Sequence, residues 1–188
     1  MDRIKKSGFI NKAVIGIMLA LSAGIGGLYY YNRFSDGIYE YECSTDKQFI
    51  CSFFKENFYW LVHDYSKTYS PEYMLDNKSP SQRDPRVIGT LKVKTYRIKG
   101  RPVGFITYYP SELYSGRILF LGVDKNYRSK GIARKLLSSA FADLKRMGVR
   151  TIWINTRTDN TPGRKLYESL GFTEGTNDGA YVDYKRAA

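Results

Sequence analysis

The spacing of hydrophobic residues predicts an apolar N-terminal segment, then a mainly helical region, and then a region rich in strands. Residues 13–32 are twenty uncharged positions, enough as one helix to cross the hydrocarbon layer of a membrane. An extended piece at 37–41 follows as a first strand or a tether. From 49 to 61, apolar residues recur three and four positions apart, which predicts an amphipathic helix capped by Ser44 or Thr45.

The middle of the chain predicts the start of a sheet. A short helix after Pro71 and a loop over 76–85 lead into three stretches rich in Val, Ile, Thr, Tyr and Phe, at 86–96, 101–109 and 117–123. The first two form a hairpin. The third is nearly all apolar, which suits a central buried strand.

Helices and strands alternate in the last third. An apolar helical face runs over 132–147, and a strand follows at 151–155. Next come a helix capped by Asn160 and a closing hairpin at 172–174 and 180–185. This order predicts an α/β domain with a mixed sheet and flanking helices. A doubly wound dinucleotide-binding fold is not expected, because no Gly-x-Gly-x-x-Gly follows the first strand.

The apolar segment has two interpretations. As a single-pass membrane anchor it has four basic residues and one acid in the segment 1–12 ahead of it, and tyrosines at its end, where aromatic rings favour the headgroup boundary. As a signal it has a small-residue cleavage site at Ala20-Leu21-Ser22, and the body would be exported after cleavage. The charge bias favours a cytoplasmic 1–12, which would put the body on the far side.

Small residues recur every four positions within that segment, at Gly16, Ala20 and Gly24. Such a face would let two helices approach closely, so a dimer is one expectation. We therefore divide the chain into a basic segment 1–12, a transmembrane helix or signal 13–32, a tether or first strand 33–44, and a folded body 45–186.

Composition and charge narrow the function. The 188 residues include 30 Lys and Arg against 18 Asp and Glu, a net charge of +12, with two Cys and one His. This composition excludes a disulfide-built scaffold and a disordered chain. One His and two Cys are also too few for a four-ligand Cys/His zinc cluster. Nine of the basic residues lie in 117–150. No nucleic-acid motif accompanies them, so an anionic cofactor and a membrane explain the charge better than nucleic acid.

The join between the third strand and its helix is a phosphate site in outline. A basic loop over 123–131 runs into a helix start, where unpaired N–H groups, the helix dipole and side-chain cations converge. Gly131 lets the backbone approach a ligand closely. The loop lacks the Gly-Lys-Ser/Thr end of a P-loop, so a nucleoside triphosphate with magnesium is not favoured.

Two motifs in order carry a family resemblance. Arg128-x-x-Gly131-x-Ala133 opens that helix, and residues 160–172 read Asn-Thr-Pro-Gly-Arg-Lys-Leu-Tyr-Glu-Ser-Leu-Gly-Phe. They resemble the Gln/Arg-x-x-Gly-x-Gly/Ala and the Leu-Tyr-Glu-x-Leu-Gly-Phe signatures of the GNAT superfamily of acyl-CoA-dependent N-acyltransferases. The resemblance covers roughly 45–186. It implies a GNAT-like, mostly antiparallel central sheet.

The resemblance also implies where acetyl-CoA, the co-substrate, would bind without any metal. In this family the fourth and fifth strands splay apart, and the pantetheine arm pairs with the fourth strand, here Leu121, Gly122 and Val123. The diphosphate would rest on the helix start, at Arg128, Ser129, Lys130, Gly131, Ile132 and Ala133. Asn160 would contact the pantetheine or cap its helix. Tyr167 would be the general acid for the departing thiolate, and an N–H near Val123 would stabilise the oxyanion.

Two features depart from the family. Gly163 stands where alanine is usual, which lowers helix stability by ~1 kcal/mol and would leave room for the cofactor. The fourth strand, 118–122, lacks the glutamate that many members use as general base, so a water chain, Glu112 or Glu42 would have to serve. The expected function is acetyl transfer to a primary amine of a protein or small molecule. A membrane-tethered acyl-CoA-binding module without turnover is the alternative.

Overall fold

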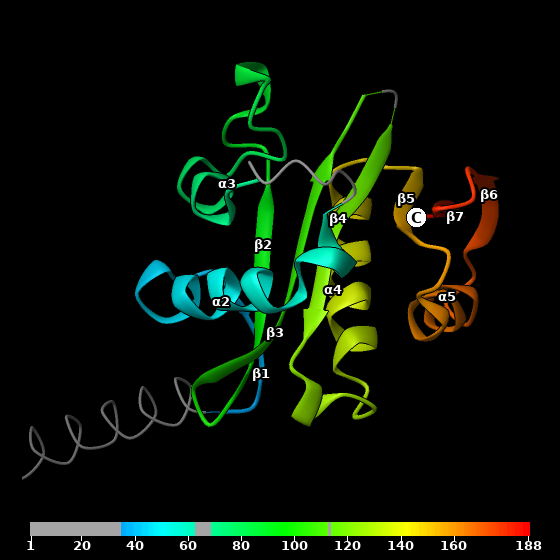
Figure 1. The fold of residues 1–188 in the computed structure, drawn as a ribbon. Helices are drawn as coiled ribbons and strands as arrows, with labels where there is room; N and C mark the ends of the chain where they lie inside the picture. The colour runs from blue at the N-terminus through cyan, green and yellow to red at the C-terminus, as the bar shows by residue number, and fades with distance from the viewer. Residues whose placement is uncertain (1–34, 63–68, 113) are drawn as a thin grey trace, which may run out of the picture. The chain divides into compact units, whose positions relative to one another are not determined.

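The computed structural model describes residues 35–62, 69–112 and 114–188. The body from residue 36 onward is built on a seven-stranded sheet (Figure 1). The expectations for the basic segment 1–12 and the apolar segment 13–32, including its dimer face, lie outside the described residues. Within the described ranges, no helix is long and apolar enough to cross a membrane.

The helices and strands follow one another in the order that the sequence predicts. Their bounds are β1 (Gly37–Glu40), α2 (Cys43–Leu61), α3 (Pro71–Asn77), β2 (Lys92–Ile98), β3 (Arg101–Pro110), β4 (Ser115–Val123), α4 (Ile132–Arg146), β5 (Thr151–Arg157), α5 (Thr161–Glu168), β6 (Thr173–Asn177) and β7 (Tyr181–Ala187). The sheet order is β1-β2-β3-β4-β5-β7-β6. β4 is thus the central strand. Only β4 and β5 pair in parallel, which confirms a mixed, mostly antiparallel sheet.

The strand predicted over 86–96 begins later than expected. Pro85–Val87 forms a 3-10 helix, because the Asp84 side chain accepts a hydrogen bond from the amide of Arg86 and proline favours the first helical position. β2 therefore starts only at Lys92. The expected strand was wrong over its first six residues.

The predicted cap of α2 was also wrong. The helix starts at Cys43, so Glu42 is the N-cap residue in place of Ser44 or Thr45. The amide of Glu42 donates to the buried Asp46 over 2.8 Å. A carboxylate inside the first turn therefore satisfies the helix start.

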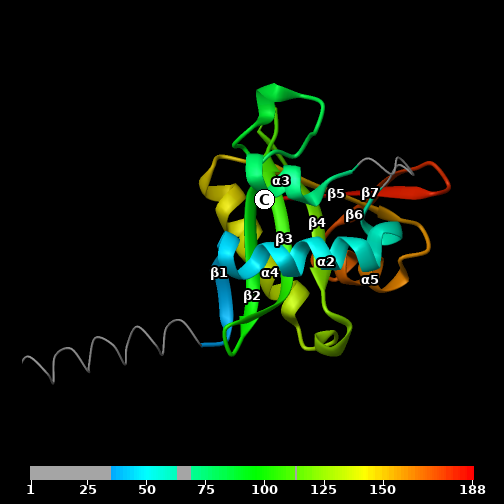
Figure 2. The same ribbon diagram turned by 60° about the vertical axis from the view of Figure 1, so that its left-hand side comes forward.

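Two hydrophobic cores cover the two faces of the sheet. On one face α2 and α3 bury Ile50, Phe54 and Met74 against the strands, and Figure 2 shows α2 crossing in front of β3 and β4. On the other face α4 buries Leu136 and Leu137. The central strands are therefore enclosed by helices on both sides.

The neighbouring strands β4 and β5 separate part-way along their length. Their pairing runs from Ser115 with Thr151 to Ile118 with Ile154 and then ends. The rest of β5 continues to pair with β7. The last five residues of β4 therefore lie beside a gap, as the family resemblance implies.

Candidate functional site

A cavity of about 720 Å³ occupies the gap between β4 and β5. β4 forms its floor, α4 and the preceding loop form one end, and α5 closes one side. The structure brings ten of the eleven sequence-predicted residues to this cavity: Leu121, Gly122, Val123, Arg128, Ser129, Gly131, Ile132, Ala133, Asn160 and Tyr167. The motifs at 128–133 and 160–172 thus meet in one place.

The backbone of β4 offers the gap alternate N–H groups. The amides of Phe120 and Asp124 donate toward β3, to the Thr107 side chain and the Val103 carbonyl. Because successive residues of a strand face opposite neighbours, the amides of Leu121 and Val123 point toward the gap.

Gly122 has a different role from its neighbours Leu121 and Val123. By the same alternation, its amide faces β3 rather than the gap. A Cβ at this position would lie 2.6 Å from ring carbons of both Phe53 and Phe105. The glycine therefore lets two aromatic rings pack against the floor of the cavity.

The loop after β4 turns sharply before α4. A 3-10 helix, Lys125–Tyr127, comes first, an element that the sequence did not predict. Ser129 and Gly131 then take left-handed backbone conformations, with φ of 61° and 75°. Gly131 is the N-cap of α4, and nothing within 4 Å would meet its Cβ. Its backbone conformation, rather than crowding, therefore explains the glycine.

The start of α4 combines free amides with positive charge. The first amides of a helix have no acceptor within it, and the helix dipole is positive there. The Arg128 guanidinium donates through Nε to the Val123 carbonyl over 3.0 Å, which fastens the loop to the end of β4. The Lys130 ammonium instead lies over the Tyr127 ring, 5.0 Å from its centre. Lys130 is the one predicted residue that does not line the cavity.

Tyr167 reaches the cavity from α5 with little exposure. The residue is 6% exposed. Burial raises the pKa of Tyr167 above its ordinary value, and a hydrogen bond with the Thr156 side chain offsets part of the rise. Thr156 in turn accepts a hydrogen bond from Nδ2 of Asn160 over 2.9 Å.

The two acids named from the sequence as general bases do not line the cavity. Glu112 is exposed and follows β3, so it lies at the end of β4 opposite to the loop that leads into α4. Glu42 pairs with Arg97 over 3.4 Å. Among the described lining residues the one acid is Asp159, next to Asn160 in the chain.

Sequence reasoning missed the contribution of α2. Phe53, Asn57, Trp60 and Leu61 line the cavity from the opposite face of the sheet to α4. Asn57 has non-helical backbone angles and marks a kink. No local signal separates these residues from ordinary core positions of an amphipathic helix.

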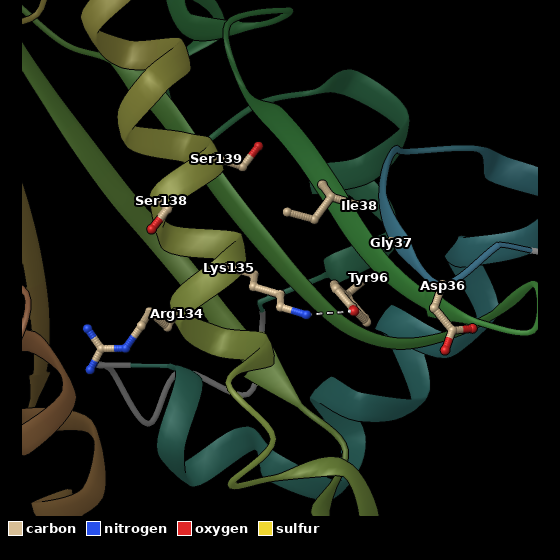
Figure 3. A pocket seen from close by; sticks show the side chains of 8 residues that line it. All are labelled: Asp36, Gly37, Ile38, Tyr96, Arg134, Lys135, Ser138 and Ser139. Atoms are coloured by element: carbon tan, nitrogen blue, oxygen red, sulfur yellow. Dashed lines mark hydrogen bonds between the residues drawn. The ribbon is translucent and has the colours of Figure 1, made fainter. Parts of the chain in front are cut away.

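A second hollow, of about 670 Å³, lies where α4 faces β1 and β2 (Figure 3) and is lined by Asp36, Gly37, Ile38, Tyr96, Arg134, Lys135, Ser138 and Ser139. There the Lys135 ammonium donates to the Tyr96 hydroxyl over 3.2 Å. Arg134 lines both spaces, and its guanidinium donates to Ser169 beyond α5. None of the predicted site residues lines this hollow, so the candidate site is the cavity between β4 and β5.

Residues 50–172 match the acetyltransferase (GNAT) family along well over half of the chain. The chain belongs to this family. Ribosomal protein bS18-alanine N-acetyltransferase of Escherichia coli K12 is 41% identical to this GNAT protein over 56 residues, which are 30% of this chain and 38% of that one. Mycothiol acetyltransferase of Geodermatophilus obscurus is 35% identical over 72 residues, 38% of this chain and 22% of that one. The matches thus span well under half of these relatives.

Solved structures confirm the GNAT-like α/β fold. The ribosomal-protein-S18-alanine N-acetyltransferase of Escherichia coli superposes with a TM-score of 0.60 at 21% identity, over 81% of this chain and 94% of that one. PaiA N-acetyltransferase of Thermoplasma acidophilum, in complex with coenzyme A, gives 0.62 at 19% identity, over 82% and 99%. At such identities the likeness concerns the fold.

Proposed function

We propose that this GNAT protein transfers an acetyl group from acetyl-CoA to a primary amine of a protein or small molecule. One observation carries the proposal: β4 stops pairing with β5 after Ile118, and its unpaired edge lies between the start of α4 and the buried Tyr167. Both curated relatives are acetyltransferases by name, and one is named for an alanine of a ribosomal protein. These names support the reaction class.

The residues present fit acetyl-CoA, which supplies a thioester-activated acetyl group. The amide of Val123, the nearer of the two open amides to α4, would pair with its pantetheine as a neighbouring strand would. The first amides of α4, at Ile132 and Ala133, with Ser129, would bind its diphosphate. Arg128 would add charge from the rim, and Lys130 would act only at longer range, because it does not line the cavity.

The chain's residues would then divide the proton transfers of the reaction. As the amine nitrogen bonds to the acetyl carbon, the bond from that carbon to sulfur breaks. Tyr167 would give its proton to the departing sulfur, and the open amide near Val123 that lies farther from α4, that of Leu121, would stabilise charge on the carbonyl oxygen. The attacking amine would release its proton to water, because neither Glu112 nor Glu42 lines the cavity. Tyr167 then regains a proton from solvent.

A second candidate function is acyl-CoA binding without turnover. It is favoured by one observation, that among the described lining residues the only carboxylate is Asp159. The test is release of free thiol from acetyl-CoA with a panel of amines, with the mass of each amine measured afterwards. One acetylated amine for each thiol supports the transferase. Tight acetyl-CoA binding without any thiol release supports the binding module.

We also propose that residues 13–32 anchor the protein in a membrane by a single pass. The support is the sequence: twenty uncharged positions preceded by basic residues. The full chain should remain in the membrane pellet after alkaline carbonate washing, and Leu19→Arg should release it. A mature chain shortened by roughly 22 residues would instead support the cleaved signal. Protease digestion of intact cells shows on which side the body lies.

A further inference from the structure

We propose that the α2 end of the cavity receives a second positive charge of the acceptor, between the Asp159 carboxylate and the Trp60 indole. The preferred substrates are then amines that carry another cationic group. This inference rests on the proposed acetyl transfer and names its substrate class.

The charges that line the cavity are separated by sign. Among the described lining residues, Arg128 and Arg134 lie at the α4 end, and Asp159 precedes α5. A donor with phosphates is therefore favoured at the α4 end, and a cation is favoured beside Asp159. Because β4 and β5 leave a gap, the α2 side is open to an acceptor from the other face of the sheet.

Asp159 is held in place with binding capacity to spare. One carboxylate oxygen accepts the Tyr59 hydroxyl over 2.8 Å, and the other lies 3.3 Å from Nε of Arg157. Each carboxylate oxygen has two lone pairs, and the side chain is 51% exposed, so a further donor can bind. The hydrogen bond from Tyr59 also holds the pKa of Asp159 below its ordinary value, which keeps the group charged at neutral pH.

Arg157 does not present its charge to the cavity. Its guanidinium lies 3.7 Å from the centre of the Tyr59 ring and 5.2 Å from that of Tyr181, and it donates to the Tyr181 hydroxyl over 3.0 Å. The side chain is only 11% exposed and is not among the lining residues. Arg157 therefore holds the carboxylate from the side away from the cavity. Among the described residues, Asp159 is the ionised group that faces an acceptor at this end.

Trp60 supplies the second contact for a cation. It is 48% exposed, lines the cavity and meets Tyr59 edge to face at 4.9 Å. Indole is the strongest of the aromatic side chains in binding cations. Asp159 adjoins Asn160, which is linked through Thr156 to Tyr167. The second positive charge of the acceptor would thus bind at a distance of one short alkyl chain from the reacting amine.

The test compares amines matched in length. Thiol release is measured with 1,4-diaminobutane and with butylamine, and with the dipeptide amides Ala-Lys and Ala-norleucine, so that free diamines and basic peptides are distinguished. For at least one pair, kcat/KM should be about tenfold higher for the cationic member. Asp159→Asn should remove that preference, mainly through a higher KM for the cationic member of each pair. Trp60→Leu, at an exposed position, should reduce the preference in the same direction.

Glu56→Gln is the matched control, because Glu56 lies on α2 but does not line the cavity. Equal kcat/KM within both pairs would overturn the inference, and so would an equal loss for both members in the Asp159 variant. Acetylation of butylamine with no preference leaves the transferase intact and refutes only the acceptor site. Absence of thiol release with every amine refutes both.

Discussion

The amide of Gly163 donates to Oδ1 of Asn160 over 3.2 Å, and a Cβ at position 163 would lie 2.5 Å from Nδ2 of the same side chain. The glycine therefore makes room for the helix cap. The sequence suggested that it makes room for a cofactor. The same Asn160 side chain donates to Thr156, so the cap also fixes a residue that contacts Tyr167.

Gly163→Ala should destabilise the protein, although alanine normally stabilises a helix interior by ~1 kcal/mol over glycine. The new methyl group displaces the Asn160 side chain, which loses both the helix cap and the hydrogen bond to Thr156, and each loss costs about 1 kcal/mol. The free energy of unfolding in urea should fall by roughly 1 kcal/mol. An increase would mean that Asn160 moves aside at no cost.

Tyr167→Phe should lower kcat by about 100-fold, because a positioned general acid typically contributes that much or more. The dissociation constant for acetyl-CoA should stay within about twofold, since the ring still packs against Phe172 and Tyr184. Steady-state thiol release and calorimetry measure the two quantities. An unchanged kcat would remove Tyr167 from the proton transfer.

Arg128→Ala and Lys130→Ala should differ in their effect on acetyl-CoA binding. Arg128 lines the cavity and fastens the loop to Val123, so its loss should weaken binding about tenfold, equivalent to roughly 1.4 kcal/mol. Lys130 points to Tyr127, and its loss should weaken binding by less than about threefold. Calorimetric titration measures both. Equal losses would show that net charge alone matters.

Asp143→Asn should destabilise the fold in a pH-dependent way. Burial alone would raise the pKa of Asp143, but hydrogen bonds from Lys94 and Tyr108 hold it below its ordinary value. Its contribution to stability is therefore complete above the ordinary carboxyl pKa and is lost as the pH falls through the lower folded pKa.

At pH 7 the variant leaves the buried Lys94, which lies 2.5 Å from Asp143, without that partner, so roughly 3 kcal/mol should be lost. The difference between variant and wild type should shrink below about pH 4. Urea unfolding at pH 7 and pH 3 measures it. A difference that is the same at both values would contradict this account.

Much of the back half of the fold could be predicted from the sequence, because its signals are local. β5, α5 and the cap Asn160 follow from periodicity, from Pro162 near the first helical position and from a short polar side chain. The start of β2 could not be predicted in this way. Val87 and Ile88 favour a strand, but Asp84 and proline form a local turn that overrides that preference.

That the start of α4, Asn160 and Tyr167 line one cavity was likewise predictable, since their two motifs are continuous in sequence. The part of the cavity that α2 lines was not. The Tyr59 hydroxyl binds Asp159, 100 residues further along the chain, and such a contact leaves no trace in either segment. Gly122 also has a role that only packing reveals, because Phe53 and Phe105 come from different elements.

Acetyl-CoA is expected to bind along the open half of β4, and hydrogen exchange can detect this binding residue by residue. On addition of acetyl-CoA to the full chain, the amides of Leu121 and Val123 and those of Ile132 to Arg134 should become protected, while Gly122 should change less. Protection confined to the hollow between α4 and strands β1 and β2 (Figure 3), or none at saturating acetyl-CoA, would show that acetyl-CoA does not bind along β4.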